Sequence, residues 1–255
     1  MVLNMNTNMW ALYAREVKRF QKIWLDTIFN PIVSIALYLG VFGIVTAGRE
    51  VGSLPYLTFV YSGLLAMLVI NNSFSNPSFA LVISKNLGNI IDLQLAPIAV
   101  WRIGIAYALA AFTRGVFALV VALLATIWFI PGLGLPSHPI YFVIGLFLTG
   151  LEFGMLGVAF GFWAKNFEAL TFMTSFVMQP MIFLAGVFYP IASLPQPWTT
   201  ISLFNPIHHN INFFRYSLTG YSDLNPLVSL VVILAFSAVF FVAMQLAAKR
   251  TIVVK

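Results

Sequence analysis

Two charged residues inside long apolar stretches are the first candidates for chemistry in this sequence. Arg114 lies within the apolar run 102–130, and Glu152 lies within the run 140–163. A charge at the centre of a bilayer costs about 3 kcal/mol or more, so such residues are usually paired or face a polar cavity. At 1.5 Å per residue, they lie about 24 and 18 Å from the outer ends of their runs. We expect an ion pair that fixes helix packing, or one polar cavity on a transport path.

The residue types give little support for a metal site, a cofactor site or a catalytic site. His208 and His209 are adjacent, so they do not share a helix face, and no carboxylate stands at ligand spacing; no metal site is predicted. The chain has no cysteine, no GxxxxGK[ST] phosphate loop and no GxSxG elbow. We therefore expect neither a bound cofactor nor ATP hydrolysis by that route. An intramembrane enzyme is disfavoured, whereas an ion-coupled secondary transporter that uses Glu152 as a proton site stays open.

The composition requires lipid as the solvent. Hydrophobic residues make up 61% of the 255 residues and charged residues only 8%, against about 25% charged in soluble domains. We predict an all-α integral membrane protein with a single transmembrane domain over 1–255. Six apolar runs are long enough to cross about 30 Å of hydrocarbon; they are 28–47, 56–76, 102–130, 140–163, 169–189 and 226–248.

The distribution of basic residues predicts the orientation. With the N-terminus in the cytoplasm, the outer segments hold only Arg49 and Arg215. The inner segments hold ten basic residues, namely Arg15, Lys18, Arg19, Lys22, Lys85, Arg102, Lys165, Lys249, Arg250 and Lys255. This bias places both termini in the cytoplasm. The basic balance is therefore a topology signal in contact with membrane lipids, and nucleic acid is not an expected partner.

Two amphipathic segments lie on the expected cytoplasmic side. Segment 9–24 places basic residues opposite apolar ones, which indicates a helix at the membrane interface. This helix is either a plain anchor or a lever that also touches a cytoplasmic partner. Segment 84–96 indicates a short helix that ends before Pro97. Such a helix either lies on the membrane or inserts into a groove of a soluble partner.

The outer segment 191–223 is apolar and broken by prolines, which suggests re-entrant half-helices packed on protein. The dipeptide Asn-Pro recurs in the chain, and Asn followed by Pro is a good helix start. The four copies are Asn30-Pro31, Asn76-Pro77, Asn205-Pro206 and Asn225-Pro226. Helix capping explains this recurrence better than an inverted repeat of the kind that secondary transporters contain.

Across nearly its whole length the chain resembles the permease subunit of type-2 ABC exporters, in particular the small bacterial stand-alone permeases. The most specific match is a Leu-Pro step followed by Pro, an aliphatic residue, His and Arg at family spacing. Here these residues are Leu194, Pro195, Pro206, Ile207, His209 and Arg215. Segments 186–190 and 164–168 also look like the family, while Ala185 stands where the family more often has Gly, Ser, Thr or Cys.

The resemblance implies a dimer of permeases in the inner (plasma) membrane, with two cytoplasmic ABC ATPase subunits that bind ATP and Mg. The chain would not be an enzyme by itself. It would export an amphipathic, lipid-linked, saccharide or drug-like substrate along the interface with its second copy. The segment 84–96 would be the coupling helix that docks on the ATPase, through Lys85, Asn89, Ile90, Asp92 and Leu93. Lys165 and Glu168 would add a second contact, and the signature residues Leu194, Pro195, Pro206, His209 and Arg215 would belong to an outer gate.

Overall fold

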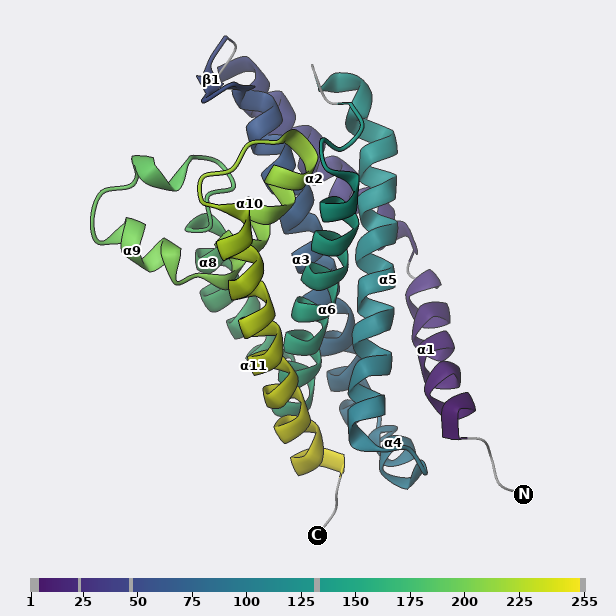
Figure 1. Ribbon diagram of the computed structural model, residues 1–255. Coiled ribbons are helices and arrows are strands. Elements are labelled where there is room, and N and C mark those ends of the chain that lie inside the picture. The colour runs from purple at the N-terminus through teal and green to yellow at the C-terminus, as the bar shows by residue number, and fades with distance from the viewer. Residues whose placement is uncertain (1–4, 23, 46–47, 131–133, 253–255) are drawn as a thin grey trace.

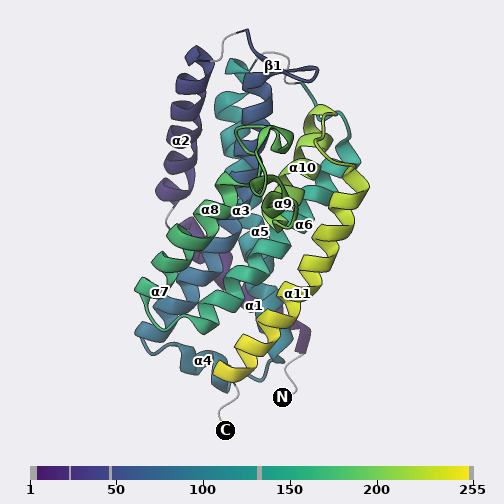
Figure 2. The same ribbon diagram turned by 90° about the vertical axis from the view of Figure 1, so that its left-hand side faces the viewer.

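The computed structural model describes residues 5–22, 24–45, 48–130 and 134–252. Four helices form the body of the molecule (Figures 1 and 2). They are α3 (Tyr56–Asn86), α5 (Val100–Thr126), α6 (Pro139–Trp163) and α11 (Pro226–Ile252). Helix α6 is central, because it packs against α3, α5 and α11. The two main clusters of buried apolar side chains lie where these helices meet.

Glycines on α6 allow its close packing with α3. A Cβ atom built on Gly157 would lie 2.3 Å from the carbonyl oxygen of Phe74, and one on Gly161 would lie 2.9 Å from Leu81 Cβ. In lipid the hydrophobic effect does not drive helices together, so small residues that permit close backbone approach stabilise the contact instead. The glycines therefore set the spacing of the central helix pair.

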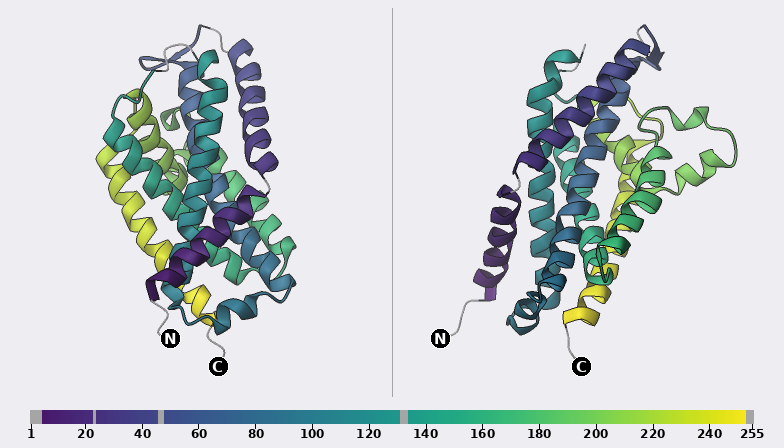
Figure 3. Two further views of the ribbon diagram at one scale, coloured as in Figure 1. Left: turned by 90° about the vertical axis from the view of Figure 1, so that its right-hand side faces the viewer. Right: turned by 180° about the vertical axis from the view of Figure 1, so that it is seen from behind.

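The first two helices run along one side of this body (Figure 3). Helix α1 (Met5–Gln21) packs on α5, and α2 (Trp24–Val45) packs on α5 and α3. The predicted interface helix 9–24 thus ends earlier, at Gln21, and Trp24 belongs to the next helix; Ile23 lies outside the described residues. The buried face of α1 consists of Leu12, Glu16 and Phe20. Glu16 is tolerated there because Arg19 pairs with it at 2.8 Å.

Helix α3 is ten residues longer than the predicted segment 56–76. Its 31 residues span about 46 Å, more than the hydrocarbon core of a bilayer requires. The expected helix start at Asn76-Pro77 is wrong, because Pro77 lies inside α3. Arg19 donates to the carbonyl and side-chain oxygens of Asn76, at 3.0 and 2.9 Å.

The other three Asn-Pro pairs differ in whether a helix starts at them. Asn30-Pro31 lies inside α2, so no helix starts there. Asn205 and Asn225 do cap helices: their side-chain oxygens accept hydrogen bonds from the backbone amides two residues further on, at 3.0 and 2.9 Å. Capping is therefore confirmed at these two pairs and wrong at Asn76.

The segment predicted as the fifth span is shorter and irregular. It comprises α7 (Phe167–Phe172), the π-helical turn η2 (Met173–Met178) and α8 (Gln179–Phe183), and ends six residues before the predicted limit at 189. Among the described residues, four helices are long and apolar enough to cross a membrane: α3, α5, α6 and α11. Ile32–Gly43 and Phe167–Phe183 are shorter apolar stretches. The six-span count therefore stays a prediction.

The two ends of the bundle carry different small elements (Figure 1). One end, called the α4 end below, holds α4 (Ile90–Leu95), the start of α1 and the end of α11. The opposite end holds an antiparallel hairpin of β1 (Glu50–Val51) and β2 (Leu54–Pro55), and the turn η1 (Ile127–Phe129). Within the predicted segment 191–223, η3 (Ile191–Ser193) and α9 (Trp198–Leu203) project sideways, and α10 (Pro206–Thr219) packs into the body.

Candidate functional site

Helix α4 presents apolar side chains to the outside at the α4 end. Gly88, with φ of +76°, reverses the chain after α3, a left-handed conformation that favours glycine. Leu93 is buried and anchors α4 on the bundle. On the opposite side Leu87, Ile91 and Leu95 are 68%, 54% and 79% exposed. Ile91 and Leu95 lie on α4 and Leu87 follows the end of α3, so together they form an exposed apolar surface that is not used for packing within the chain.

Two residues expected to touch the partner are turned toward their own chain instead. Lys85 donates to the carbonyl oxygens of Phe162 and Ala164 at the end of α6. A cation there satisfies carbonyls that the helix leaves unpaired and complements its dipole. Leu93 is 3% exposed in the core. Helical phase explains the burial of Leu93, since the face that holds α4 on the bundle cannot also face outward. Lys85 belongs instead to the last turn of α3, where it reaches the end of α6.

The remaining coupling candidates lie at the surface. Asn89 and Asp92 are exposed, and Ile90 is half-buried. Lys165 and Glu168 are exposed at the start of α7, where Asn166 accepts a hydrogen bond from Ala169 N at 3.0 Å. Figure 2 places α7 toward the same end of the molecule as α4. The structure thus leaves both predicted contact regions accessible from one side.

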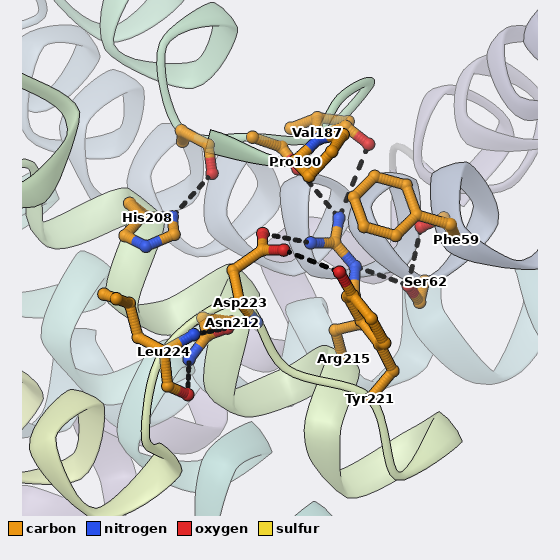
Figure 4. Close-up of polar contacts among 12 residues, drawn as sticks. Phe59, Ser62, Val187, Pro190, His208, Asn212, Arg215, Tyr221, Asp223 and Leu224 are labelled. Atoms are coloured by element: carbon orange, nitrogen blue, oxygen red, sulfur yellow. Dashed lines mark hydrogen bonds and ion pairs between the residues drawn. The ribbon is translucent and has the colours of Figure 1, made fainter. Parts of the chain in front are cut away.

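Arg215 is a buried node that joins four segments of the chain (Figure 4). Its guanidinium is fully buried and donates to Ser62 Oγ on α3 at 3.1 Å and to the carbonyl of Gly186 at 2.8 Å. It also pairs with Asp223 at 3.5 Å and stacks 3.6 Å over the ring of Phe59. Burial raises the pKa of the Asp223 carboxyl, and the Arg215 guanidinium opposes that rise. The predicted outer arginine is therefore an internal cross-link.

The other signature residues also hold the outer segment together. His209 Nε2 lies 2.8 Å from the carbonyl of Leu203, and its Nδ1 lies 3.3 Å from Ser229 Oγ on α11. Pro206 occupies the first turn of α10. Leu194 and Pro195 lie apart from this cluster: Pro195 is exposed, and the carbonyl of Leu194 accepts a hydrogen bond from Thr199. The Leu-Pro step thus shapes the projecting hairpin, while the His-Arg part anchors α10.

The structure does not bring Arg114 and Glu152 together. Glu152 is fully buried, and its Oε2 accepts a hydrogen bond from Asn210 Nδ2 on α10 at 2.9 Å. Within the described part of the chain, its Oε1 has no hydrogen-bond partner. Arg114 instead borders a cavity beside α3. The depth argument placed both residues at similar levels, but their side chains leave α5 and α6 toward different neighbours.

The cavity beside α3 has a partly polar lining. It has a volume of about 470 Å³ and lies between α2, α3 and α5, with Arg19 of α1 at one edge. We call it the α3 groove. Its polar wall combines Arg114 with amide and hydroxyl side chains of α3; these are Asn71, Asn72, Ser75 and Asn76. Among the described residues, no side-chain hydrogen bond involves Asn71 or the hydroxyl of Ser75.

The polar wall was not predicted, although its signal is in the sequence. Asn71, Asn72, Ser75 and Asn76 form two pairs at i and i+4 near the inner end of an apolar run, so they share a helix face. Neutral amides carry no charge and do not interrupt a hydropathy pattern as Arg114 does.

Comparison with known proteins decides the family. The profile of the family described as ABC-2 type transporter matches residues 7–219, from α1 to the end of α10. The chain belongs to the ABC-2 type transporter family. This ABC-2 protein is therefore a membrane permease subunit and not an enzyme in itself, as the sequence predicted. Membership in the family also implies association with an ABC ATPase.

Named relatives share most of the length of this ABC-2 permease. The inner membrane transport permease YadH of Escherichia coli strain K12 is 30% identical over 234 residues, which cover 91% of this chain and 90% of YadH. Nodulation protein J of Rhizobium leguminosarum bv. trifolii is 27% identical over 233 residues, covering 84% and 82%. Nodulation protein J of Rhizobium meliloti strain 1021 is 25% identical over 232 residues, with the same coverage.

Proposed function

We propose that this ABC-2 permease exports an amphipathic substrate from the cytoplasm, powered by a separate ATPase, with two copies of each subunit in the transporter. The substrate would be lipid-linked, a saccharide or a drug-like compound. The observation that carries the proposal is the exposed aliphatic surface formed by Ile91 and Leu95 of α4 and by Leu87, which precedes this helix. Amphipathic helices that lay such a face into a groove are a common mode of docking.

The position of α4 supports a mechanical role. Leu93 connects α4 to a cluster of buried side chains contributed by α1, α3, α5, α6 and α11. Gln94 donates to the carbonyl of Thr251 near the end of α11, at 2.9 Å. A force applied to α4 by the ATPase would therefore act on the base of the whole bundle. Closely packed interiors transmit such displacement with little deformation.

The proposed orientation places the α4 end in the cytoplasm. This end carries Lys85, Lys249 and Arg250, in keeping with the excess of basic residues on the inner side of membrane proteins. The name of YadH, an inner membrane transport permease, supports the same membrane and the same class of activity for this chain. The dimer, the six spans and an outer gate formed by the 191–223 segment remain parts of this proposal.

The rival function, ion-coupled secondary transport through Glu152, is less well supported. Glu152 bonds to Asn210, whose own Oδ1 accepts a hydrogen bond from Thr149 at 2.8 Å. The carboxyl thus ties α6 to α10, and it borders neither of the two described cavities. A proton site of a carrier needs access to one side of the membrane or the other. The geometry favours a role in helix packing.

The proposed docking role is tested by placing charged side chains on the exposed face of α4. We expect a variant carrying both Ile91→Asp and Leu95→Asp to bind the purified ATPase at least tenfold more weakly. Each aliphatic side chain buried at a contact contributes about 1.5–3 kcal/mol, and about 1.4 kcal/mol corresponds to tenfold. Substrate-dependent ATPase activity and transport in proteoliposomes should fall in parallel, with the thermal unfolding of the permease unchanged.

The matched control is Leu135→Asp, which makes the same change at an exposed site, 92% accessible, at the opposite end of the molecule. This variant should bind the ATPase as the unaltered chain does. Full ATPase binding and transport by the double α4 variant would refute the proposed docking role. Transport of substrate by the permease alone, along an ion gradient, would refute ATP-driven export.

A further inference from the structure

A second cavity lies beside the α3 groove, toward the α4 end. It has a volume of about 520 Å³ and is bordered by α1, α3 and α5 and by the turn into α4. We call it the basic mouth. Its lining includes three cationic side chains of α1, a fourth from the residue that follows this helix, and two carboxylates; these are Arg15, Lys18, Arg19 and Lys22, with Glu16 and Asp92. The lining is therefore cationic overall.

The charged side chains of the basic mouth differ in how accessible they are to a ligand. Glu16 is 3% exposed and forms ion pairs with Arg15 and Arg19, at 3.4 and 2.8 Å. That carboxylate is already compensated within α1. Lys18 and Lys22 are exposed and make no ion pair with a described residue. The two lysines are thus the accessible cations of the mouth, one on α1 and one directly after it.

The basic mouth and the α3 groove adjoin each other. Arg19 and Ile83 line both cavities. Arg19 stands at the boundary, held by Glu16 and by Asn76, whose side-chain oxygen accepts from it at 2.9 Å. From Ile83 to Leu64, the lining residues of the groove cover about 28 Å of α3 at 1.5 Å per residue. One path therefore leads from the mouth at the α4 end deep into the apolar body.

The polarity of the lining changes along this path. Cations dominate the mouth, followed in the groove by the amides of Asn76, Asn72 and Asn71 together with Arg114. The far part of the groove is apolar, formed by Leu64, Met67 and Leu68. A cationic entrance, an amide-lined middle and an apolar far end are complementary to a molecule with an anionic head and a hydrophobic tail. Charge attraction is stronger here than in water, because the surroundings are apolar.

We propose that the basic mouth and the α3 groove together bind an anionic amphiphile, with its phosphate or carboxylate head at the mouth and its apolar part along the groove. Lysine and arginine side chains recognise such oxyanions by charge and by directed hydrogen bonds. The volumes fit the range of small-molecule sites, about 300–1,000 Å³ each. The inference rests on the proposed export function only where it identifies this amphiphile as cargo; binding itself is independent of transport.

Binding is tested on the purified ATPase–permease complex in nanodiscs of phosphatidylcholine. The probe is a fluorescent phosphatidic acid, and the uncharged counterpart is the same label on diacylglycerol. We expect the double variant Lys18→Glu and Lys22→Glu to bind the phosphatidic acid probe about tenfold more weakly or worse, since each reversal replaces an attraction to the anionic head by a repulsion. The diacylglycerol probe should bind weakly to every variant.

The matched control reverses two exposed cations at the same end of the molecule. Lys249 and Arg250 lie in the last turn of α11 and line neither cavity. The variant Lys249→Glu with Arg250→Glu should retain binding within twofold. Equal losses in both double variants would reduce the effect to general surface attraction and overturn the proposal. Binding of the diacylglycerol probe as tight as that of the phosphatidic acid probe would overturn it as well.

The groove is tested by filling it. Met67 is partly buried against the core and lines the groove, so Met67→Trp should weaken the long-chain probe several-fold and leave a short-chain analogue unaffected. Inorganic phosphate should not displace the long-chain probe. Equal displacement by phosphate, or no effect of Met67→Trp on a variant that unfolds at the usual temperature, would exclude the groove as the tail site.

A transport assay distinguishes three outcomes: the amphiphile is the cargo, the amphiphile is a resident lipid, or the export proposal itself fails. The α4 variant with Ile91→Asp and Leu95→Asp should bind the probe normally but not move it across proteoliposomes. ATP-driven movement by the unaltered complex, lost in the Lys18 and Lys22 variant, identifies the anionic amphiphile as cargo. If the probe binds but an otherwise active transporter does not move it, the site holds a resident anionic lipid. This result would refute the identification of the amphiphile as cargo, but not the proposed binding site.

Discussion

The surroundings of Glu152 distinguish between two roles for this residue, helix packing and proton transfer. Its Oε2 accepts from Asn210, and its Oε1 has no hydrogen-bond partner in the described part of the chain. An ionised carboxylate with an unsatisfied oxygen in a fully buried site carries a large desolvation cost. A glutamine side chain reproduces the observed contact, because its carbonyl oxygen can accept the same hydrogen bond from Asn210.

We therefore expect Glu152→Gln to leave ATP-driven transport within about twofold of the unaltered rate. Glu152→Ala should destabilise the permease by about 1–3 kcal/mol, because it leaves Asn210 without its acceptor and opens a void. Transport is measured in proteoliposomes at several pH values, with and without a protonophore, and stability by thermal unfolding. Abolished transport in a stable Glu152→Gln protein would instead indicate that the carboxyl takes up and releases a proton.

At this scale the sequence identified the unusual residues but not their partners. Arg114 and Glu152 stand out against apolar neighbours, and arithmetic along a helix gives their depth. The direction in which each side chain leaves its helix depends on rotation of the helix, which packing against the neighbouring helices decides. Lys85 shows the same limit, since its partners are the carbonyls of Phe162 and Ala164, distant in sequence.

At the scale of elements, the contact between α3 and α6 depends on the absence of a side chain. A Cβ atom at Gly157 would overlap the carbonyl oxygen of Phe74, at 2.3 Å. A backbone atom cannot move aside as a flexible side chain can. Gly40 offers a matched comparison in α2, because a Cβ atom there would meet nothing within 4 Å.

We predict that Gly157→Ala destabilises the permease by about 1–3 kcal/mol, the usual cost of overpacking, although alanine is the better helix former. Gly40→Ala should have no effect or raise stability by up to about 1 kcal/mol, through helix propensity alone. The measurement is thermal unfolding of each purified variant in the same detergent. Equal midpoints for the two variants would show that α3 and α6 do not approach as closely as described.

Hydropathy predicted the bounds of helices that are uninterrupted apolar runs. It predicted the bounds less well where a proline or an irregular turn occurs within the run. Helix α6 occupies Pro139–Trp163 against an expectation of 140–163. The end of α3 could not be predicted, because the helix continues past Pro77, a residue that more often ends or kinks a helix. The segment from α7 to α8 ends early at Phe183, and the turn that follows places Gly186, with φ of +76°, so that its carbonyl reaches Arg215.

At the scale of the whole molecule, the proposed function requires that α4 and the outer segment lie on opposite sides of a membrane. In Figure 1, α4 lies at one end of the bundle, whereas α9 and α10 lie in the opposite half. Leu95 in α4 and Leu135 before α6 are 79% and 92% exposed, respectively. The chain contains no cysteine, so a single introduced thiol reports on its own position without any background substitution.

We expect Leu95→Cys to react with a membrane-impermeant maleimide only after the cells are permeabilised, because excess positive charge retains that end in the cytoplasm. Leu135→Cys should react in cells whose inner membrane is intact, once the reagent can reach the outer face of that membrane. Labelling is followed by a mass shift on a gel, with the cysteine-free chain as the blank. The reverse pattern would place α4 outside, where no ATPase could reach it, and would remove the basis for coupling and for a cytoplasmic entrance at the basic mouth. Labelling of both thiols in intact cells would show that the two ends are not separated by the bilayer.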